Sequence, residues 1–166
     1  AVAYHVGQLD QGLKQMLVMV NSSRVSHLTR AAGMMRRCLN EAMAAARHRS
    51  AFAKPVIEHP LMRRQLLKII VPTEQALSCM LYAASGLSDR SERSKQVLRL
   101  LTPIGKFRAC RDNITVATAA MEVRGGNGYI EDWPNSKLVR DAHLGLLWEG
   151  TSSVNALDIV RRAVGK

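Results

Sequence analysis

The chain has 166 residues, of which 47% are hydrophobic and 22% are charged. This composition indicates one globular domain and excludes a disordered or collagen-like chain. The 24 Lys and Arg residues against 13 Asp and Glu give a formal net charge of +11. That charge fits solvated helix faces, or an acidic partner such as a phosphate-rich cofactor, coenzyme A, nucleic acid or an acidic region of the same protein.

The sequence gives no sign of a membrane or secreted protein. No apolar run reaches the roughly 20 residues that span a bilayer, and the N-terminal segment AVAYHVGQ lacks the pattern of a secretory signal. The cysteines at 38, 79 and 110 lie far apart and have no metal-ligand spacing. We therefore expect free thiols, no metal site and a cytoplasmic setting.

Apolar residues recur at three- and four-residue steps in the first part of the chain, which predicts helix. Residues 1–8 suit the tail of a strand that belongs to something outside this chain. A helical pattern starts at Gly12, with Ser22 and Ser23 marking a local start or kink. Between residues 24 and 47 one apolar stripe is formed by Leu28, Ala31, Met35, Leu39 and Ala42.

Two more long helices follow, over about residues 60–87 and 91–123. The segment 50–59, with Pro55, separates the first from the second, and Pro72 should kink the second. Asp89 and Glu92 fit a capping box at the start of the third helix, which Pro103 and Gly105 should bend. The inward residues expected are Leu66, Ile69, Ile70, Leu77 and Leu81, then Leu98, Leu101, Ile104, Ile114, Ala117 and Met121.

A glycine-rich turn over residues 125–128 ends the third helix. Alone, it indicates a tight reversal that uses Asn127-Gly128. A short helix over 134–142 follows, with Pro134 in its first turn, then a brief apolar stretch and a last helix over 152–164. The expected fold is all-α, an up-down four-helix bundle with short additional helices, as a single domain over residues 1–166.

From residue 121 the sequence reads MEVRGGNGYIEDWPNSKLVRDAHLGLLWEGTSSVNALDIVRR. Its GGNGY turn, its LVRDA segment and its WEGTSSVNALD segment resemble the C-terminal signature of acyl-CoA dehydrogenases. Upstream, AAGMMRRCLNEA and RSAFAKPVIEHP resemble earlier segments of that family, so that nearly all of residues 8–164 is covered. LLTPIGKFRAC, the glutamate of MEVRGGNGY and the tryptophan of WEGT are most similar to the alkylation-response branch.

The resemblance implies FAD-dependent α,β-dehydrogenation of an acyl-CoA, a reaction of fatty acid metabolism. It also implies an N-terminal helical domain and a middle β-domain that are missing here, so that residues 1–8 would be the tail of that β-domain. The isolated chain is then expected to bind FAD weakly, to lack turnover and to form a homo-oligomer, a dimer or tetramer. The alternative, from the alkylation-response branch, is a DNA-binding flavoprotein whose basic helices contact phosphate.

The resemblance places the reacting carboxylate at Glu149, which would remove the α-proton of the thioester while hydride leaves to flavin N5. Leu146, Leu147 and Trp148 precede it and would shield it from water. Without the resemblance, Glu149 would be read as an ordinary acid at the entry of the last helix. Arg24 and Gly150 match substrate-side positions of the family, although Arg24 would also fit a surface helix start.

FAD-binding positions are implied in three places. Thr151, Ser152 and Ser153 follow the base, and Thr151 would also serve as an N-cap. Arg49 and Phe52 match a pair that reaches the FAD of a neighbouring subunit, the Arg facing the pyrophosphate, although Arg49 could be a solvated loop residue. Ala51 and Ala53 depart from the family pattern. The residues expected along the adenosine half are Glu122, where many members carry Gln, Gly125 and Gly126.

Overall fold

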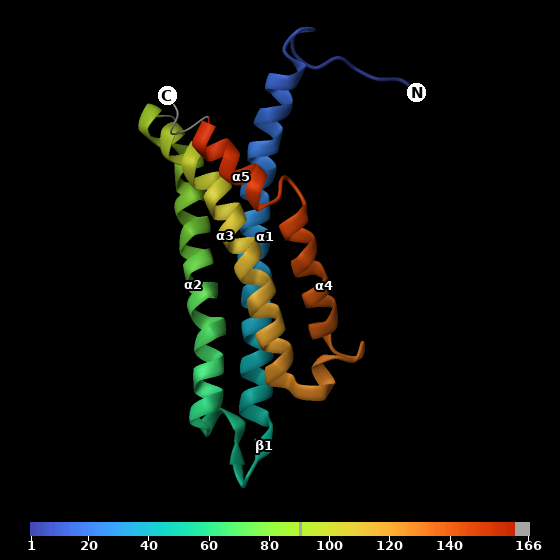
Figure 1. Cartoon of the computed structure of the whole chain (residues 1–166), viewed down its shortest axis with the longest axis vertical. Helices are drawn as coiled ribbons and strands as arrows, with labels where there is room; N and C mark the ends of the chain where they lie inside the picture. The colour runs from blue at the N-terminus through green and yellow to red at the C-terminus, as the bar shows by residue number, and fades with distance from the viewer. Residues whose placement is uncertain (90, 162–166) are drawn as a thin grey trace.

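The computed structural model describes residues 1–89 and 91–161 and consists almost wholly of helices (Figure 1). The elements in chain order are α1 (Gly12–His48), β1 (Ser50–Ala51), β2 (Lys54–Pro55), the 3-10 helix η1 (Val56–Glu58), α2 (Pro60–Ser88), α3 (Glu92–Arg124), the 3-10 helix η2 (Gly125–Gly128), α4 (Pro134–Leu147) and α5 (Ser152–Ile159). β1 and β2 form a small antiparallel hairpin at one end of the bundle. The predicted all-α fold is confirmed.

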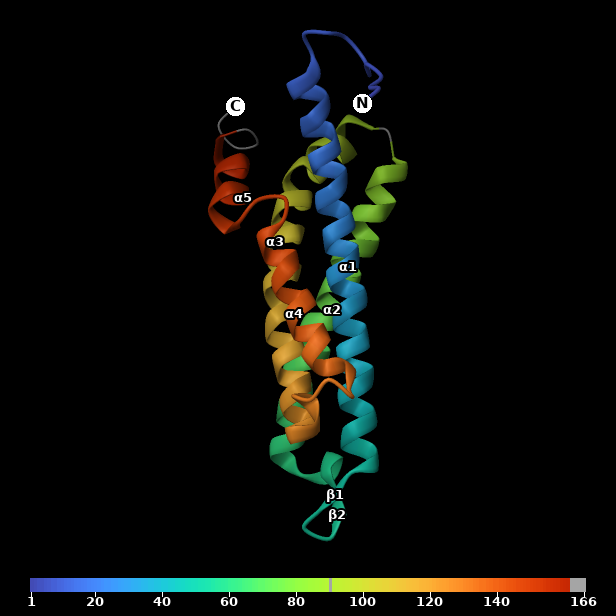
Figure 2. The same cartoon turned by 90° about the vertical axis from the view of Figure 1, so that its right-hand side faces the viewer.

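The bundle is arranged around α1 and α3. α1 packs against α2, α3 and α4, while α5 packs on α3 (Figure 2). The apolar stretch predicted to follow a short helix instead extends α4 to Leu147, so that α4 is the fourth helix of the bundle. Residues 1–8 form no strand and extend away from the end of α1 (Figure 1). The predicted last helix starts at Ser152 as expected, and its predicted end at Val164 lies outside the described residues.

Alanine dominates the contacts between the helices. Small side chains let helices approach closely, and the larger Leu28, Met35, Ile69 and Val116 fill the remaining space. The fully buried alanines are Ala42, Ala83, Ala120 and Ala142, with Ala31, Ala46, Ala76, Ala109 and Ala117 nearly so. α1, α2 and α3 therefore each contribute a stripe that contains buried alanines, and this stripe is the periodic signal in the sequence.

Several helix ends follow local chemistry. Proline opens α2 and α4 at Pro60 and Pro134, where its missing N–H costs nothing. The capping box expected at Asp89 and Glu92 is wrong: Ser91 is the N-cap of α3, and its hydroxyl accepts from the Ser94 amide. The Asp89 carboxylate accepts from the Ser91 amide and from nearby serine hydroxyls, and these hydrogen bonds lower its pKa.

Other local predictions were wrong in detail. α1 runs without a break through Ser22, whose hydroxyl donates to the Val18 carbonyl one turn earlier. Leu81 and Ile104, expected inside, are both exposed. Leu81 lies to one side of the stripe formed by Leu66, Ile69, Thr73, Ala76 and Ala83, through which α2 meets the rest of the bundle.

The three cysteines are free thiols, and they differ in burial. Burial raises the pKa of the Cys38 thiol to about 12 and also raises the pKa of Cys110. Because the thiolate is the reactive form, both thiols should be inert in the folded chain. With a thiol-specific reagent at pH 8, we expect Cys79, which is half-buried, to be labelled first and the other two only in denaturant. Timed mass spectrometry of the labelled peptides would measure this, and equally fast labelling of Cys38 would contradict it.

Candidate functional site

Glu149 lies in the turn between α4 and α5, in the left-handed region of backbone conformation. Its φ is +56° and that of Gly150 is +98°, values that a residue other than glycine adopts only when its surroundings hold it there. The half-buried carboxylate turns toward α1, where Ser23 Oγ donates to Glu149 Oε1 over 2.9 Å. The carboxylate is thus fixed at the surface of the bundle by a residue of another helix.

Leu146, Leu147 and Trp148 were expected to shield this carboxylate from water, and for the last two this expectation is wrong. Leu146 is half-buried, but Leu147 and Trp148 are 64% and 54% exposed. α4 ends at Leu147, and much of both side chains is left uncovered by the described residues, although the His27 ring meets one edge of the Trp148 ring. Within this chain, the face of the turn that carries Leu147 and Trp148 is therefore open.

Arg24 is buried beneath the turn, which excludes its interpretation as a surface residue. Its Nη1 lies 2.6 Å from Asp158 Oδ2 of α5, with the two side chains only 7% and 14% exposed. Arg24 Nε donates to the Glu149 carbonyl over 3.3 Å. A single guanidinium on α1 thus links the turn to the helix that follows it, in the fork geometry that arginine provides.

Two further side chains, which the sequence analysis did not single out, bind carbonyls of the same turn. Lys106 Nζ of α3 donates to the Gly150 carbonyl over 2.8 Å and to the Leu146 carbonyl over 3.4 Å. Asn155 Nδ2 of α5 donates to the Gly150 and Thr151 carbonyls over 2.8 and 3.1 Å. Both side chains are 1% exposed, and burial lowers the pKa of the Lys106 ammonium.

The histidine nearest to the turn shares this electropositive environment. His27 is buried on α1, one turn after Ser23, and its ring meets Trp148 edge-on with centroids 6.0 Å apart. Burial, followed by the nearby Arg30 and Lys106 cations, lowers the pKa of His27. A neutral ring at ordinary pH is the consequence, and it packs against the indole of Trp148.

The predicted hydroxyl group at the start of α5 lies beside a shallow groove. Thr151 occupies the N-cap position, but its side chain makes no capping hydrogen bond, contrary to the expectation. Ser152 Oγ accepts from Arg111 Nη2 over 3.0 Å. Together with Ser153, Ser152 borders a groove of about 400 Å³ between α3 and α5, whose other lining residues are Ile104, Phe107, Asn155, Ala156 and Ile159.

A second group of predicted residues gathers at the other end of α4. Gly125 ends α3 with a φ of +73°, and a Cβ atom there would lie 2.8 Å from Arg49 Nη1. The turn is a 3-10 helix, Gly125–Gly128, and the chain reverses direction there between α3 and α4, as expected (Figure 1). Neither Asn127 nor Gly128 has a positive φ. Arg49 also donates to the Arg124 carbonyl over 3.3 Å. The positive φ at Gly125 favours glycine, and the Arg49 guanidinium lies beside its open face.

Arg49 and Gly126 border a cavity of about 480 Å³, whose other lining residues are Ala45, His48, Arg124, Asn127 and Trp133. The Arg124 guanidinium lies over the Trp133 ring, 4.3 Å from its centroid, and pairs with Glu41 of α1. Cations, an aromatic ring and accessible glycine backbone therefore line one space.

Two predicted cofactor residues do not line this cavity. Phe52 is 92% exposed at the tip of the hairpin, where its ring meets the His59 ring edge-on. Glu122 is exposed and accepts a hydrogen bond from Gln65 Nε2 of α2 over 2.6 Å. The structure thus brings Arg49, Gly125 and Gly126 together and leaves these two outside.

The two groups of residues are well separated. They lie at opposite ends of α4, which has 14 residues. At about 1.5 Å per residue, its ends are about 21 Å apart. The group at the α4–α5 turn comprises Arg24, Glu149, Gly150, Thr151, Ser152 and Ser153, and the hairpin-end group comprises Arg49, Gly125 and Gly126.

Residues 10–164 match the family model of the acyl-CoA dehydrogenase C-terminal domain. The chain belongs to this family. It is 31% identical over 163 residues to AidB of Escherichia coli (strain K12), which covers 97% of the chain and 30% of that protein. It is 32% identical over 171 residues to acyl-CoA dehydrogenase family member 11 of Caenorhabditis elegans, which covers 100% of the chain and 28% of that protein.

A solved structure of this family has the same fold. The Caenorhabditis elegans ACDH-11 structure in complex with C11-CoA superposes with a TM-score of 0.91 at 30% identity, over 97% of this chain and 28% of that one. This chain thus spans about 30% of the length of the two relatives given above.

Within residues 1–89 and 91–161, no helix is long and apolar enough to cross a membrane. The same residues contain no group of three His, Cys, Asp or Glu side chains that could hold a metal ion.

The Arg24–Asp158 pair gives a direct test of the packing at the turn. Arg24→Gln removes two buried charge-assisted hydrogen bonds, to Asp158 and to the Glu149 carbonyl, so it should lower the free energy of unfolding by about 3 kcal/mol. Arg36→Gln is the matched control, because Arg36 also joins α1 to another helix, through an exposed pair with Glu74. It should cost less than about 1 kcal/mol. Urea unfolding followed by circular dichroism would measure both, and equal losses would contradict the prediction.

Proposed function

We propose that this chain is the FAD- and substrate-binding C-terminal domain of a flavin-dependent acyl-CoA dehydrogenase, which introduces an α,β double bond into an acyl-CoA thioester. The main support is the carboxylate of Glu149, held on a left-handed turn above a buried arginine. The turn is open on the side of Leu147 and Trp148, where further domains of a longer subunit would close the pocket. The isolated chain would then lack turnover.

Glu149 is proposed as the base that removes the α-proton. Ser23 already donates to Oε1, and within the described residues no hydrogen bond is made to Oε2. Oε2 is therefore the atom that would receive the proton, while Ser23 keeps the carboxyl plane fixed. Arg24 holds the backbone of the turn in place through the Glu149 carbonyl. Gly150 has no side chain, so the thioester can approach the backbone closely at that residue.

The hairpin-end cavity fits part of a dinucleotide cofactor. Arg49 offers a planar donor set suited to a pyrophosphate, and Gly125 and Gly126 leave the backbone accessible beside it. The hydroxyl groups of Thr151, Ser152 and Ser153 would contact FAD near the base. When bound, FAD would accept the hydride that leaves the β-carbon of the substrate.

The separation of the two groups supports a homo-oligomer. The ends of α4 are about 21 Å apart, so the hairpin end would contact the FAD of a neighbouring subunit. Phe52, which is exposed at the hairpin tip, would reach outward to the same neighbour, and Glu122 would join the adenosine side through a rotated side chain. The free thiols support a reducing compartment such as the cytoplasm.

The base assignment is tested in the flavoprotein that carries this domain with its other domains. Glu149→Gln keeps the size and the Ser23 hydrogen bond but cannot accept the α-proton, so bleaching of the flavin by an acyl-CoA should be abolished. Glu58→Gln, at an exposed glutamate near the hairpin, should bleach like the wild type. Anaerobic stopped-flow absorbance would follow the flavin with a series of acyl chains, and retained bleaching in Glu149→Gln would remove this residue as the base.

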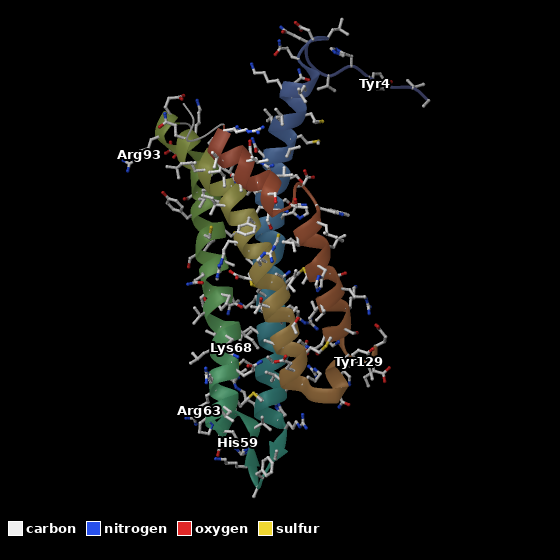
Figure 3. The ribbon with its side chains drawn as sticks, viewed as in Figure 1. Tyr4, His59, Arg63, Lys68, Arg93 and Tyr129 are labelled. Carbon is white, nitrogen blue, oxygen red and sulfur yellow. The ribbon has the colours of Figure 1, made fainter. Side chains whose placement is uncertain are left out.

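A second candidate function is binding of DNA through phosphate contacts. Exposed cations gather at the hairpin end, where Figure 3 shows Arg63 and Lys68 on α2. Arg64 follows Arg63 directly, and Arg47 lies in the last turn of α1, next to the hairpin. Within the described residues none of these four forms a salt bridge. Unpaired surface cations on a chain of net charge +11 favour a polyanion.

Salt dependence tests this second function. Arg63→Gln with Lys68→Gln should weaken duplex binding and reduce the slope of log K against log salt by about 1.8, about 0.9 for each lost phosphate contact. Arg93→Gln is the control, because Arg93 lies at the opposite end of the bundle (Figure 3). Fluorescence anisotropy with a labelled duplex between low and moderate salt would measure the slope. Absence of binding at low salt would end this proposal.

A further inference from the structure

Lys106 is a buried cation whose chemistry no step of the proposed reaction uses. It is 1% exposed and is the largest of the fully buried side chains. An ammonium group inside a protein is normally paired with a carboxylate or loses its charge. Within the described residues Lys106 forms no salt bridge, and its hydrogen bonds go to two backbone carbonyls, those of Leu146 and Gly150.

These carbonyls bracket the segment that carries Glu149. Leu146 belongs to the last turn of α4, whose carbonyl groups have no partner within the helix and attract a cation. Gly150 follows Glu149 directly and shares its left-handed conformation. The Lys106 ammonium has three donors and can bind both ends of the turn at once, which an apolar side chain of that length could not do.

Two neighbouring side chains also bind carbonyls of this turn. Arg24 binds the carbonyl of Glu149, and Asn155 binds those of Gly150 and Thr151. The carbonyl side of the turn is thereby drawn into the bundle from α1, α3 and α5. Only Lys106 spans the turn from its α4 end to Gly150.

We propose that Lys106 is a positioning residue, which holds the Glu149–Gly150 turn in its left-handed conformation by binding the Leu146 and Gly150 carbonyls together. Its importance for a reaction rests on the proposed role of Glu149 as the base. The held conformation itself is a property of this chain and can be measured without any substrate.

The first test uses Trp148, which directly precedes Glu149. In a Trp133→Phe background it is the one remaining tryptophan of the 2 in the chain. Lys106→Met removes the charge and the donors at similar length, and should change the Trp148 emission and raise its acrylamide quenching at least twofold while the far-ultraviolet dichroism stays helical. Lys95→Met, at an exposed lysine of the same helix, should change neither. A Trp148 signal unaltered by Lys106→Met would overturn the proposal.

A second pair of variants covers the case in which Lys106→Met does not fold. Lys106→Arg keeps a cation with several donors, and Lys106→Gln is shorter and neutral. If the buried charge holds the turn, the Trp148 emission and quenching should stay near the wild-type values in Lys106→Arg. In Lys106→Gln they should differ from the wild type. Equal signals in these two variants would overturn the proposal.

The second test separates this inference from the proposed function. In the flavoprotein with all its domains, Lys106→Met should lower kcat for the acyl-CoA about 10- to 100-fold with KM nearly unchanged, because the base is misplaced while the substrate site persists. Lys106→Arg should restore most of kcat. Retained activity in Glu149→Gln would remove the proposed base, yet the Trp148 measurement would still decide whether Lys106 holds the turn. An unchanged kcat in a folded Lys106→Met would refute the positioning role.

Discussion

The backbone carbonyls of the turn between α4 and α5 point into the bundle, and three buried donors bind them there. Arg24, Lys106 and Asn155 come from three different helices, and all three bind the carbonyls of Glu149 or Gly150. A left-handed conformation at a residue other than glycine costs on the order of 1–2 kcal/mol, which these bonds offset. The conformation of Glu149, and therefore the direction of its carboxylate, depends on this set of bonds.

Such a set requires helices that lie close together. The interfaces of α1 with α2 and α3 contain many alanines, which let the helices approach closely, and long side chains such as those of Arg24 and Lys106 bind groups of other helices and of the turn. The same packing excludes water, and each buried cation must then find protein partners. Arg24 finds the Asp158 carboxylate, while Lys106 has carbonyl groups only, which is why burial lowers the pKa of the lysine.

Some features that depend on neighbouring residues could be predicted from the sequence, although the capping box at Asp89 and the capping hydrogen bond of Thr151 were wrong. Contacts that folding brings together from far apart could not be predicted. Proline at the start of a helix and glycine after its end act through backbone chemistry within a few residues, and both were predicted. The partners of Glu149 and Arg24 lie 126 and 134 residues away in sequence, at Ser23 and Asp158. No local pattern distinguishes that serine from any other on α1. The prediction that Leu81 is buried was wrong for a related reason. In the sequence, an apolar residue outside the packed stripe cannot be distinguished from one inside it.

The length of α1 determines how the domain can meet a ligand. A helix neither stretches nor folds back. Ser23, which binds the Glu149 carboxylate, and Arg49, which follows the end of α1, therefore stay about 38 Å apart along that helix. A ligand that contacts both ends of one copy must be extended along the helix, whereas two copies could each offer one end to a shorter stretch of it. Phe52 favours the second arrangement, because its ring lies at the tip of the hairpin, 92% exposed, and meets the edge of His59. An aromatic ring fixed in that position contributes binding energy only when another surface covers it.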